Sequence, residues 1–217
     1  MDTITGYKDR AIASLSGKWS QGAIATLIVF AIMEVCGTTI SLPFGFINEG
    51  VETCVSLSFS ILCIPLGWGA TVYFLRLIRN ESLEYARLFD GYKDFKRIFC
   101  TMLLCGLYEV LWSLLLLVPG FIKSYSYSMT SFILKDDPTI SNNEAIEKSM
   151  QMMEGHKMDL FLLDLSLIGW LILSILTLGL GLLMLLPYYY TAHAHFYEDL
   201  KREAAVYAPQ GNEAASL

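Results

Sequence analysis

Two long apolar stretches dominate the pattern of hydrophobic and polar positions along this chain. Residues 98–122 contain a single charged side chain, that of Glu109, and residues 165–197 contain no Asp, Glu, Lys or Arg. A helix of about 20 apolar residues crosses the roughly 30 Å of hydrocarbon in a bilayer, so each stretch is long enough to span it. A helix also satisfies its own backbone groups where no water can do so. The pattern therefore predicts an all-α membrane protein.

About six transmembrane helices fit the whole chain best. The fourth is short for a full crossing at about 1.5 Å per residue. The fifth and sixth share one apolar run, 160–197, which is too long for a single crossing, and we expect it to break at residues 177–181. The alternative is one long tilted helix that bends at Pro187, which gives five spans. The first four predicted spans are about 21–43, 53–78, 97–118 and 121–134.

The parts of the chain follow one another in a repeated order. A short amphipathic stretch comes before each predicted pair of helices, and an apolar residue precedes a proline near the second helix of each pair. These steps are Ile64-Pro65, Val118-Pro119 and Leu186-Pro187. We interpret the chain as three repeated helical hairpins, each preceded by a short interfacial helix, an order common in transporters and also found in scaffolds. Before the third hairpin, Ser141 and Glu144 predict a capping box.

Charge is scarce and lies between the apolar runs. Charged residues make up 17% of the chain and its mean hydropathy is +0.49, whereas a soluble domain has roughly 25% charged residues. Short loops rich in Lys and Arg stay in the cytoplasm. We therefore expect a multi-pass protein with cytoplasmic N- and C-termini. Apart from Lys123, the Lys and Arg residues lie in four segments, 8–18, 76–97, 135–157 and 201–202.

The same distribution sets the expected domains and partners. Residues 1–200 read as a single polytopic membrane domain, and the small polar residues in 201–217 predict a flexible cytoplasmic tail. Nucleic acid is not an expected partner, because the basic residues of 76–97 are interleaved with acidic ones. The five cysteines form no close C-x-x-C pair, so neither a metal nor another cofactor is expected.

Two carboxylates lie near the middle of predicted spans, Glu34 in the first and Glu109 in the third. Ionisable groups inside a bilayer are costly and therefore point to function. A transporter could use such a carboxyl to bind a proton or a cationic substrate. Alternatively, the two carboxyls bond to Ser, Tyr or Trp side chains and only hold the bundle together.

The fourth predicted span is unusually polar. Its hydroxyl groups cannot all face lipid cheaply, so we expect this helix to be packed inside protein or beside a wet cavity. The alternative is that the hydroxyls bond to carbonyls of their own helix. Together with Glu34 and Glu109, the candidate ligand-binding or pathway residues are Lys123, Ser124, Tyr125, Ser126, Tyr127 and Ser128.

No catalytic motif is present in the sequence. A nucleotide-binding glycine loop, a zinc protease motif and a nucleophile elbow are all missing. His193 and His195 near the end of the last apolar run lie on different helix faces, so we interpret them, with the neighbouring tyrosines, as interfacial residues rather than metal ligands. We expect the protein not to be an enzyme.

Several strings in the second half of the chain resemble a known bacterial family of integral membrane proteins, catalogued as domain of unknown function 975. They include residues 114–129, Gly155-His156-Lys157, residues 164–170 and 177–181, and Phe196-Tyr197-Glu198-Asp199-Leu200. The resemblance extends from about Arg10 to Leu200, loosely over the first two spans. The chain is also distantly similar to the membrane domain attached to some glycerophosphodiester phosphodiesterases, which suggests a lipid or envelope context.

The resemblance implies a location in the bacterial inner membrane and a fold, but no reaction. Our first functional hypothesis is a non-enzymatic protein that binds a membrane lipid or a small amphiphile, or that assists an envelope protein partner. The alternative is a small transporter or channel whose path is lined by Glu34, Glu109, Lys123 and the Ser/Tyr-rich fourth helix.

Overall fold

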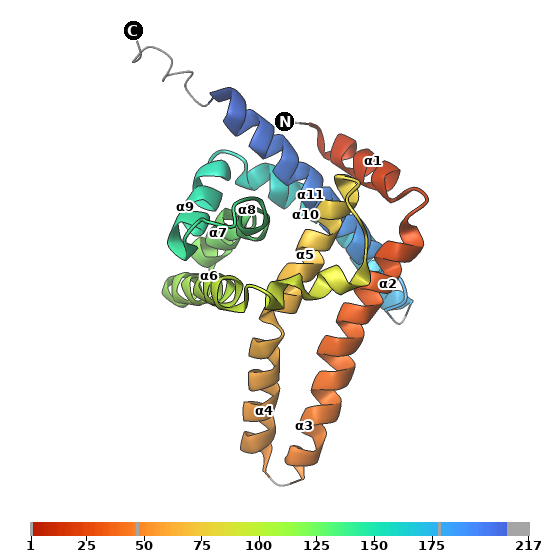
Figure 1. Cartoon of the computed structure of the whole chain (residues 1–217), viewed down its shortest axis with the longest axis vertical. Coiled ribbons are helices and arrows are strands. Elements are labelled where there is room, and N and C mark those ends of the chain that lie inside the picture. The colour runs from red at the N-terminus through yellow and green to blue at the C-terminus, as the bar shows by residue number, and fades with distance from the viewer. Residues whose placement is uncertain (1, 47, 178, 208–217) are drawn as a thin grey trace.

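Helices and short turns make up the described chain. The computed structural model describes residues 2–46, 48–177 and 179–207, and no strand occurs among them (Figure 1). The predicted class, an all-α membrane protein, is confirmed. The elements are α1 (Ile4–Leu15), α2 (Trp19–Phe30), the π-helix η1 (Ala31–Cys36), α3 (Gly37–Gly45), α4 (Glu49–Leu62), α5 (Ile64–Ile78), the 3₁₀-helix η2 (Tyr85–Tyr92), α6 (Phe95–Leu115), α7 (Leu117–Tyr127), α8 (Thr130–Asp136), α9 (Asn142–Met152), α10 (Lys157–Leu176) and α11 (Leu182–Tyr207).

Four helical stretches in the described part of the chain are long and apolar enough to cross a membrane. They correspond to the predicted first, second, third and fifth spans. The predicted total of six is not confirmed. The fourth predicted span divides into α7 and α8 at residues 128–129, and the sixth is α11, whose last ten residues carry several charges. The four stretches are Trp19–Gly45, Glu49–Ile78, Phe95–Leu115 and Lys157–Leu176.

The turn between α10 and α11 lies where the sequence predicts it. Helix α10 ends at Leu176 and α11 begins at Leu182. Gly179 in between has a φ of +86°, a left-handed conformation that glycine adopts at little cost. The alternative of one long helix to Leu186 with a bend at Pro187 is wrong, because α10 ends at Leu176 and a second helix, α11, begins at Leu182.

The turn between α6 and α7 comes earlier than Pro119-Gly120 suggests. Helix α6 ends at Leu115, a single extended residue follows, and Pro119 lies in the first turn of α7. Proline is tolerated there because the backbone N–H groups of a first turn have no partner within the helix. Proline thus marks the start of the second helix rather than the turn itself.

Glycine lets two hairpins close tightly at their tips. A Cβ atom on Gly120 would lie 2.6 Å from Cα of Ser113, and one on Gly181 would lie 2.8 Å from Cα of Ser174. Both distances are too short for non-bonded atoms, so only glycine fits at either position. The two pairs have the same spacing along the sequence, one in the α6–α7 hairpin and one in the α10–α11 hairpin.

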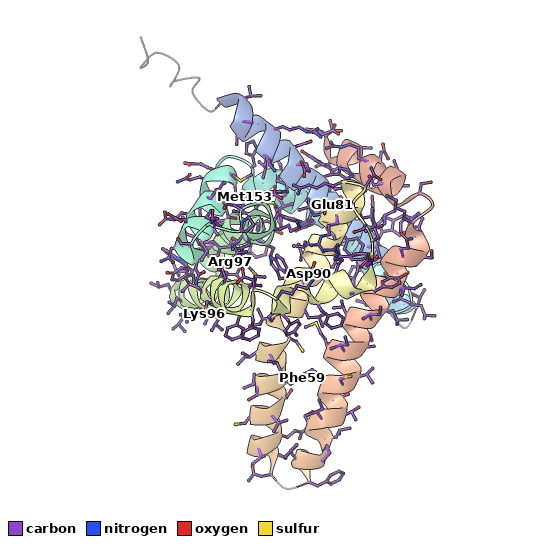
Figure 2. All side chains as sticks on the ribbon, viewed as in Figure 1. Phe59, Glu81, Asp90, Lys96, Arg97 and Met153 are labelled. Carbon is purple, nitrogen blue, oxygen red and sulfur yellow. The ribbon has the colours of Figure 1, made fainter. Side chains whose placement is uncertain are left out.

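Helices α3 and α4 project from the rest of the molecule as a pair (Figure 1). Phe59 of α4 lies between them (Figure 2), and a Cβ atom on Gly37 of α3 would come within 3.2 Å of its ring. Large apolar side chains such as Leu42 and Leu57 cover the outside of this pair. The surroundings that suit such a surface are lipid tails.

The protein core is centred on α5 and α11. In the apolar stretch that ends with α5, 67% of the most apolar 18-residue segment is buried inside protein. In the other three stretches the buried share of that segment is 11–22%. Tyr73 and Phe74 of α5 and Phe196 of α11 are almost fully buried. The remaining long helices therefore surround these two and turn apolar faces outward.

Ion pairs join α5, α8 and α11 around the C-terminal end of α5. Arg79, at the C-terminal end of α5, contacts Asp136 of α8 at 2.6 Å and Glu198 of α11 at 2.6 Å. The predicted capping box of Ser141 and Glu144 is confirmed at the start of α9. Helix α11 continues through Tyr207, past the predicted start of the tail at 201, and residues 208–217 lie outside the described part.

Candidate functional site

The N-terminal helix α1 is held against α11 by one of its faces. Thr3 caps its first turn by accepting a hydrogen bond from the N–H of Gly6 at 3.1 Å. Tyr7, Ala11 and Leu15 follow at a spacing of four, which places them on one face, and all three are buried. The helix is therefore amphipathic and packs by its apolar stripe.

Polar contacts fix this packing. Arg10 donates two hydrogen bonds to the carboxylate of Asp199, at 3.1 and 2.6 Å, and the Ser14 hydroxyl lies 2.8 Å from Nε2 of His195. Burial alone would raise the pKa of Asp199, but the hydrogen bonds and charge of Arg10 outweigh it and hold that pKa below its ordinary value. Helix α1 is thus a fixed wall of the molecule rather than a loose end.

A groove of about 530 Å³ runs between α1, the start of α2, α10 and α11. This volume lies within the usual range for small-molecule sites, roughly 300–1,000 Å³. Most of the wall is apolar, from Ile12 of α1, Trp170 and Leu173 of α10, and Leu185 of α11. The complete lining is Thr5, Lys8, Asp9, Ile12, Trp19, Trp170, Leu173, Ser174, Thr177, Gly181, Met184, Leu185 and Tyr188.

The charged residues of the groove come from α1 alone. Within the described residues, Lys8 and Asp9 form no ion pair with another side chain, unlike their neighbour Arg10. Trp19 and Trp170 also line the groove, and tryptophan is enriched where membrane meets water. The groove therefore combines a cation and an anion that have no ion-pair partner among the described residues with a long apolar wall, and an amphiphile has the same division into polar and apolar parts.

The predicted pathway residues do not lie in this groove. Glu109 and Lys123 belong to the α6–α7 hairpin, where Lys123 places its Nζ atom 5.1 Å from the centre of the Trp112 ring. Glu34 lies in η1 and lines a different cavity, between α2, η1, α5 and α11. The lining of that cavity includes no residue of α6 or α7.

The serines of α7 and its C-terminal cap, Ser128, bond to carbonyls of the same helix, which was the alternative prediction. Ser124, Ser126 and Ser128 donate to the backbone carbonyls of Phe121, Ile122 and Tyr125. Tyr127 is buried beside Tyr108, with ring centres 6.4 Å apart. The expectation that this polar stretch is packed inside protein is confirmed for Ser126 and Tyr127, which are both buried.

Tyr125 takes part in a polar cluster that the sequence did not reveal. Its hydroxyl donates to Oδ2 of Asp164 at 3.1 Å, and Oδ1 of the same carboxylate lies 2.7 Å from Nε2 of His193. The ring of Tyr189 packs on His193 with centres 4.1 Å apart. Asp164 just precedes the charge-free run and Tyr189 lies four residues before His193, and these two signals could have indicated the cluster.

The cluster joins α7, α10 and α11 and replaces the interfacial role expected of His193, which is 8% exposed. His195, the other histidine of that prediction, contacts Ser14 of α1 instead. In the described residues, no group of three or more His, Cys, Asp or Glu side chains could hold a metal ion. The arrangement links these three helices through hydrogen bonds.

The second half of this architecture has a counterpart among known families. Residues 114–204 match the family model described as "Protein of unknown function (DUF975)". The resemblance to this family is confirmed there. The DUF975 match begins near the end of α6 and covers α7 to α10 and most of α11, so it includes two of the four groove helices. Helices α1 and α2, which complete the groove, lie outside it.

Searches of curated proteins and of solved structures find no match for this chain. The distant similarity to the membrane domain of glycerophosphodiester phosphodiesterases is not shown. The DUF975 match itself names no reaction and no ligand.

Proposed function

We propose that this protein is a non-enzymatic membrane protein that holds one lipid or small amphiphile in the groove beside α1. The observation that carries the proposal is the groove itself, with an apolar wall from α10 and α11 and with Lys8 and Asp9, which form no ion pair among the described residues. A lipid has the same division into a charged headgroup and an apolar tail.

The charged residues, rather than the apolar wall, would give the site its selectivity. Inside a bilayer, a lipid tail gains little by moving from other lipid tails to a protein groove, because both surroundings are equally apolar. Charge-assisted hydrogen bonds distinguish headgroups, because they require a matching charge at the right place. Lys8 suits an acidic group such as a phosphate, and Asp9 suits an ammonium group or a hydroxyl donor.

Native mass spectrometry of the full chain, extracted gently from its own membrane, tests this proposal. We expect a discrete retained lipid mass, and reloading of the delipidated protein with phosphatidylethanolamine in preference to an uncharged diacylglycerol. Lys8→Gln should weaken retention about tenfold, since losing one charge-assisted hydrogen bond costs about 1.5 kcal/mol. Lys148→Gln, which removes an exposed lysine of α9, should not change it.

A second variant separates the groove from general lipid adhesion. Ile12→Trp would fill the groove from the α1 side without changing charge. Wild-type protein with no retained mass, or equal retention by Ile12→Trp, would contradict the proposal and direct attention to an envelope protein partner.

We also propose that the protein lies in the bacterial inner membrane with both termini in the cytoplasm. The Lys- and Arg-rich segments near α1, η2, α9 and the end of α11 support this orientation. A single cysteine placed at Thr177, in a variant without the five native cysteines, should react with a membrane-impermeant reagent from the periplasmic side. Failure of that labelling in intact cells, with labelling after lysis, would reject the six-span topology.

The alternative function, a transporter or channel, would need one path past Glu34, Glu109 and Lys123. Glu34 faces a cavity without α6 or α7 residues, and the other two lie on the α6–α7 hairpin. Binding of an amphiphile therefore has the more specific support, and Glu34 is better considered with its own cavity.

A further inference from the structure

A second cavity, of about 150 Å³, lies between α2, η1, α5 and α11, with Leu88 of η2 also on its wall. It shares no residue with the groove beside α1. At about 30 Å³ for each molecule of liquid water, its volume corresponds to about five waters, so it suits only a small ligand. Its lining is Ala25, Thr26, Val29, Phe30, Met33, Glu34, Ala70, Phe74, Leu88, Leu186 and Tyr190.

Thr26 brings an unused hydroxyl group to this cavity. The residue is 7% exposed, and its Oγ1 atom has no hydrogen-bond partner among the described residues. Threonines in helices usually bond to a carbonyl of the preceding turn, as Thr71 does to Gly67 and Thr191 does to Pro187. A buried hydroxyl without a partner costs about 1–3 kcal/mol, so this one is better explained by a ligand that completes its bonding.

Glu34 brings a carboxylate to the same cavity. Its side chain forms no ion pair or hydrogen bond with any described residue. It lies within η1, a six-residue π-helix that interrupts an otherwise α-helical membrane stretch. Single π-helical turns inside α-helices often occur at functional sites. A carboxylate in an apolar span calls for a partner of opposite charge.

Aromatic rings form the remaining polarisable wall. Phe74 of α5 and Tyr190 of α11 stack with centres 5.4 Å apart and an angle of 6° between their planes, and Phe30 of α2 lines the cavity with them. The face of an aromatic ring attracts cations, and several such rings around one site are a common way for proteins to bind organic ammonium groups. A strongly hydrated metal ion would lose its water shell here for a single carboxylate, so an organic cation fits better.

We propose that this cavity is a binding site for a small organic cation, an alkylammonium group held by the Glu34 carboxylate, the Thr26 hydroxyl and the rings of Phe30, Phe74 and Tyr190. A primary ammonium satisfies the carboxylate by charge and donates one hydrogen bond to Oγ1 of Thr26. None of these five residues lines the groove beside α1.

Isothermal titration of the purified full chain with propylammonium chloride tests the site, with 1-propanol and sodium chloride as the uncharged and inorganic controls. We expect saturable binding of the ammonium alone. Glu34→Gln should weaken it at least tenfold, while Glu109→Gln, which removes the carboxylate of α6 outside this cavity, should leave it unchanged.

Thr26→Val gives a test of geometry. It should weaken propylammonium more than tetramethylammonium, because only the former has N–H groups to donate. An unchanged far-ultraviolet circular dichroism spectrum would show that the Glu34→Gln variant is folded. The proposal is overturned if wild-type protein binds neither ammonium ion, or if Glu34→Gln and Glu109→Gln weaken binding equally.

Discussion

Replacing Arg79 with Met should destabilise the protein more than any other single loss of a surface charge. The guanidinium group of Arg79 donates two hydrogen bonds to Asp136, at 2.6 and 2.8 Å, and one to Glu198 at 2.6 Å. It therefore ties the end of α5 to α8 and α11. Methionine keeps most of the apolar stem and removes only the charge and the donors.

The cost follows from the exposure of the three side chains, which are 15–23% accessible. Exposed ion pairs contribute about 0–1 kcal/mol, and breaking a buried pair costs about 3–5 kcal/mol. Asp136 would keep Lys201 at 2.5 Å and the Tyr197 hydroxyl at 3.0 Å, whereas Glu198 would lose its only cationic partner among the described residues. We therefore expect a loss of about 2–3 kcal/mol in the free energy of unfolding.

Titration of the detergent-solubilised protein with SDS, followed by far-ultraviolet circular dichroism, measures this loss. Arg202→Met is the matched control, because Arg202 is 74% exposed and lies 3.6 Å from Asp199. Its effect should stay within about 0.5 kcal/mol. If Arg79→Met loses no more stability than Arg202→Met, the ionic contacts at this end do not hold the three helices together.

Three further predictions concern other contacts. Gly120→Ala should lower the free energy of unfolding by about 1–3 kcal/mol, because its Cβ atom would overlap Ser113. Gly106→Ala in the same hairpin is the control and should not destabilise the protein, because its Cβ atom would enter open space. Equal effects of the two variants in the SDS titration would contradict the close packing at Gly120. Asp164→Asn should lower the free energy of unfolding by about 1–3 kcal/mol, and Tyr125→Phe should lower it less. A double-mutant cycle between Tyr125 and His193 should show energetic coupling, because both contact Asp164. Additive losses would show that Tyr125 and His193 do not interact through this carboxylate. Burial opposes ionisation of Asp136, but hydrogen bonds from Arg79 and Lys201 hold its pKa well below the ordinary value. Its contribution to stability should therefore be complete near neutral pH and should decline as pH falls below about 4; an unchanged acid dependence in Asp136→Asn would contradict this.

The long apolar runs predicted the membrane class and most helix positions because bilayer thickness limits the length of a span. The break at 177–181 was predictable because glycine favours the left-handed turn found at Gly179. The interruption at residues 128–129 was not, since serine and methionine carry no comparable signal. The π-helix at 31–36 was equally hidden, because its composition matches that of the α-helices around it.

The candidate site was less predictable than the fold. A helix that is apolar on all sides gives no periodic signal of which face meets which neighbour. Glu34 could be selected because a charge in a span is rare, yet nothing in the sequence paired it with Thr26. Lys8 and Asp9 looked like ordinary residues of a polar N-terminal segment until α1 was seen to form a wall of the groove.

The run of three tyrosines on α11 shows why position matters more than residue type here. Successive residues of an α-helix point about 100° apart, so Tyr188, Tyr189 and Tyr190 face three different directions. Tyr188 lines the groove beside α1, Tyr189 packs on His193, and Tyr190 lines the cavity of Glu34. As a sequence pattern they suggested one interfacial belt. All three environments share α11, so a ligand in the groove that displaces this helix would also move a wall of the cation cavity. Binding of the lipid and of the ammonium ion should therefore be measured on the same preparation.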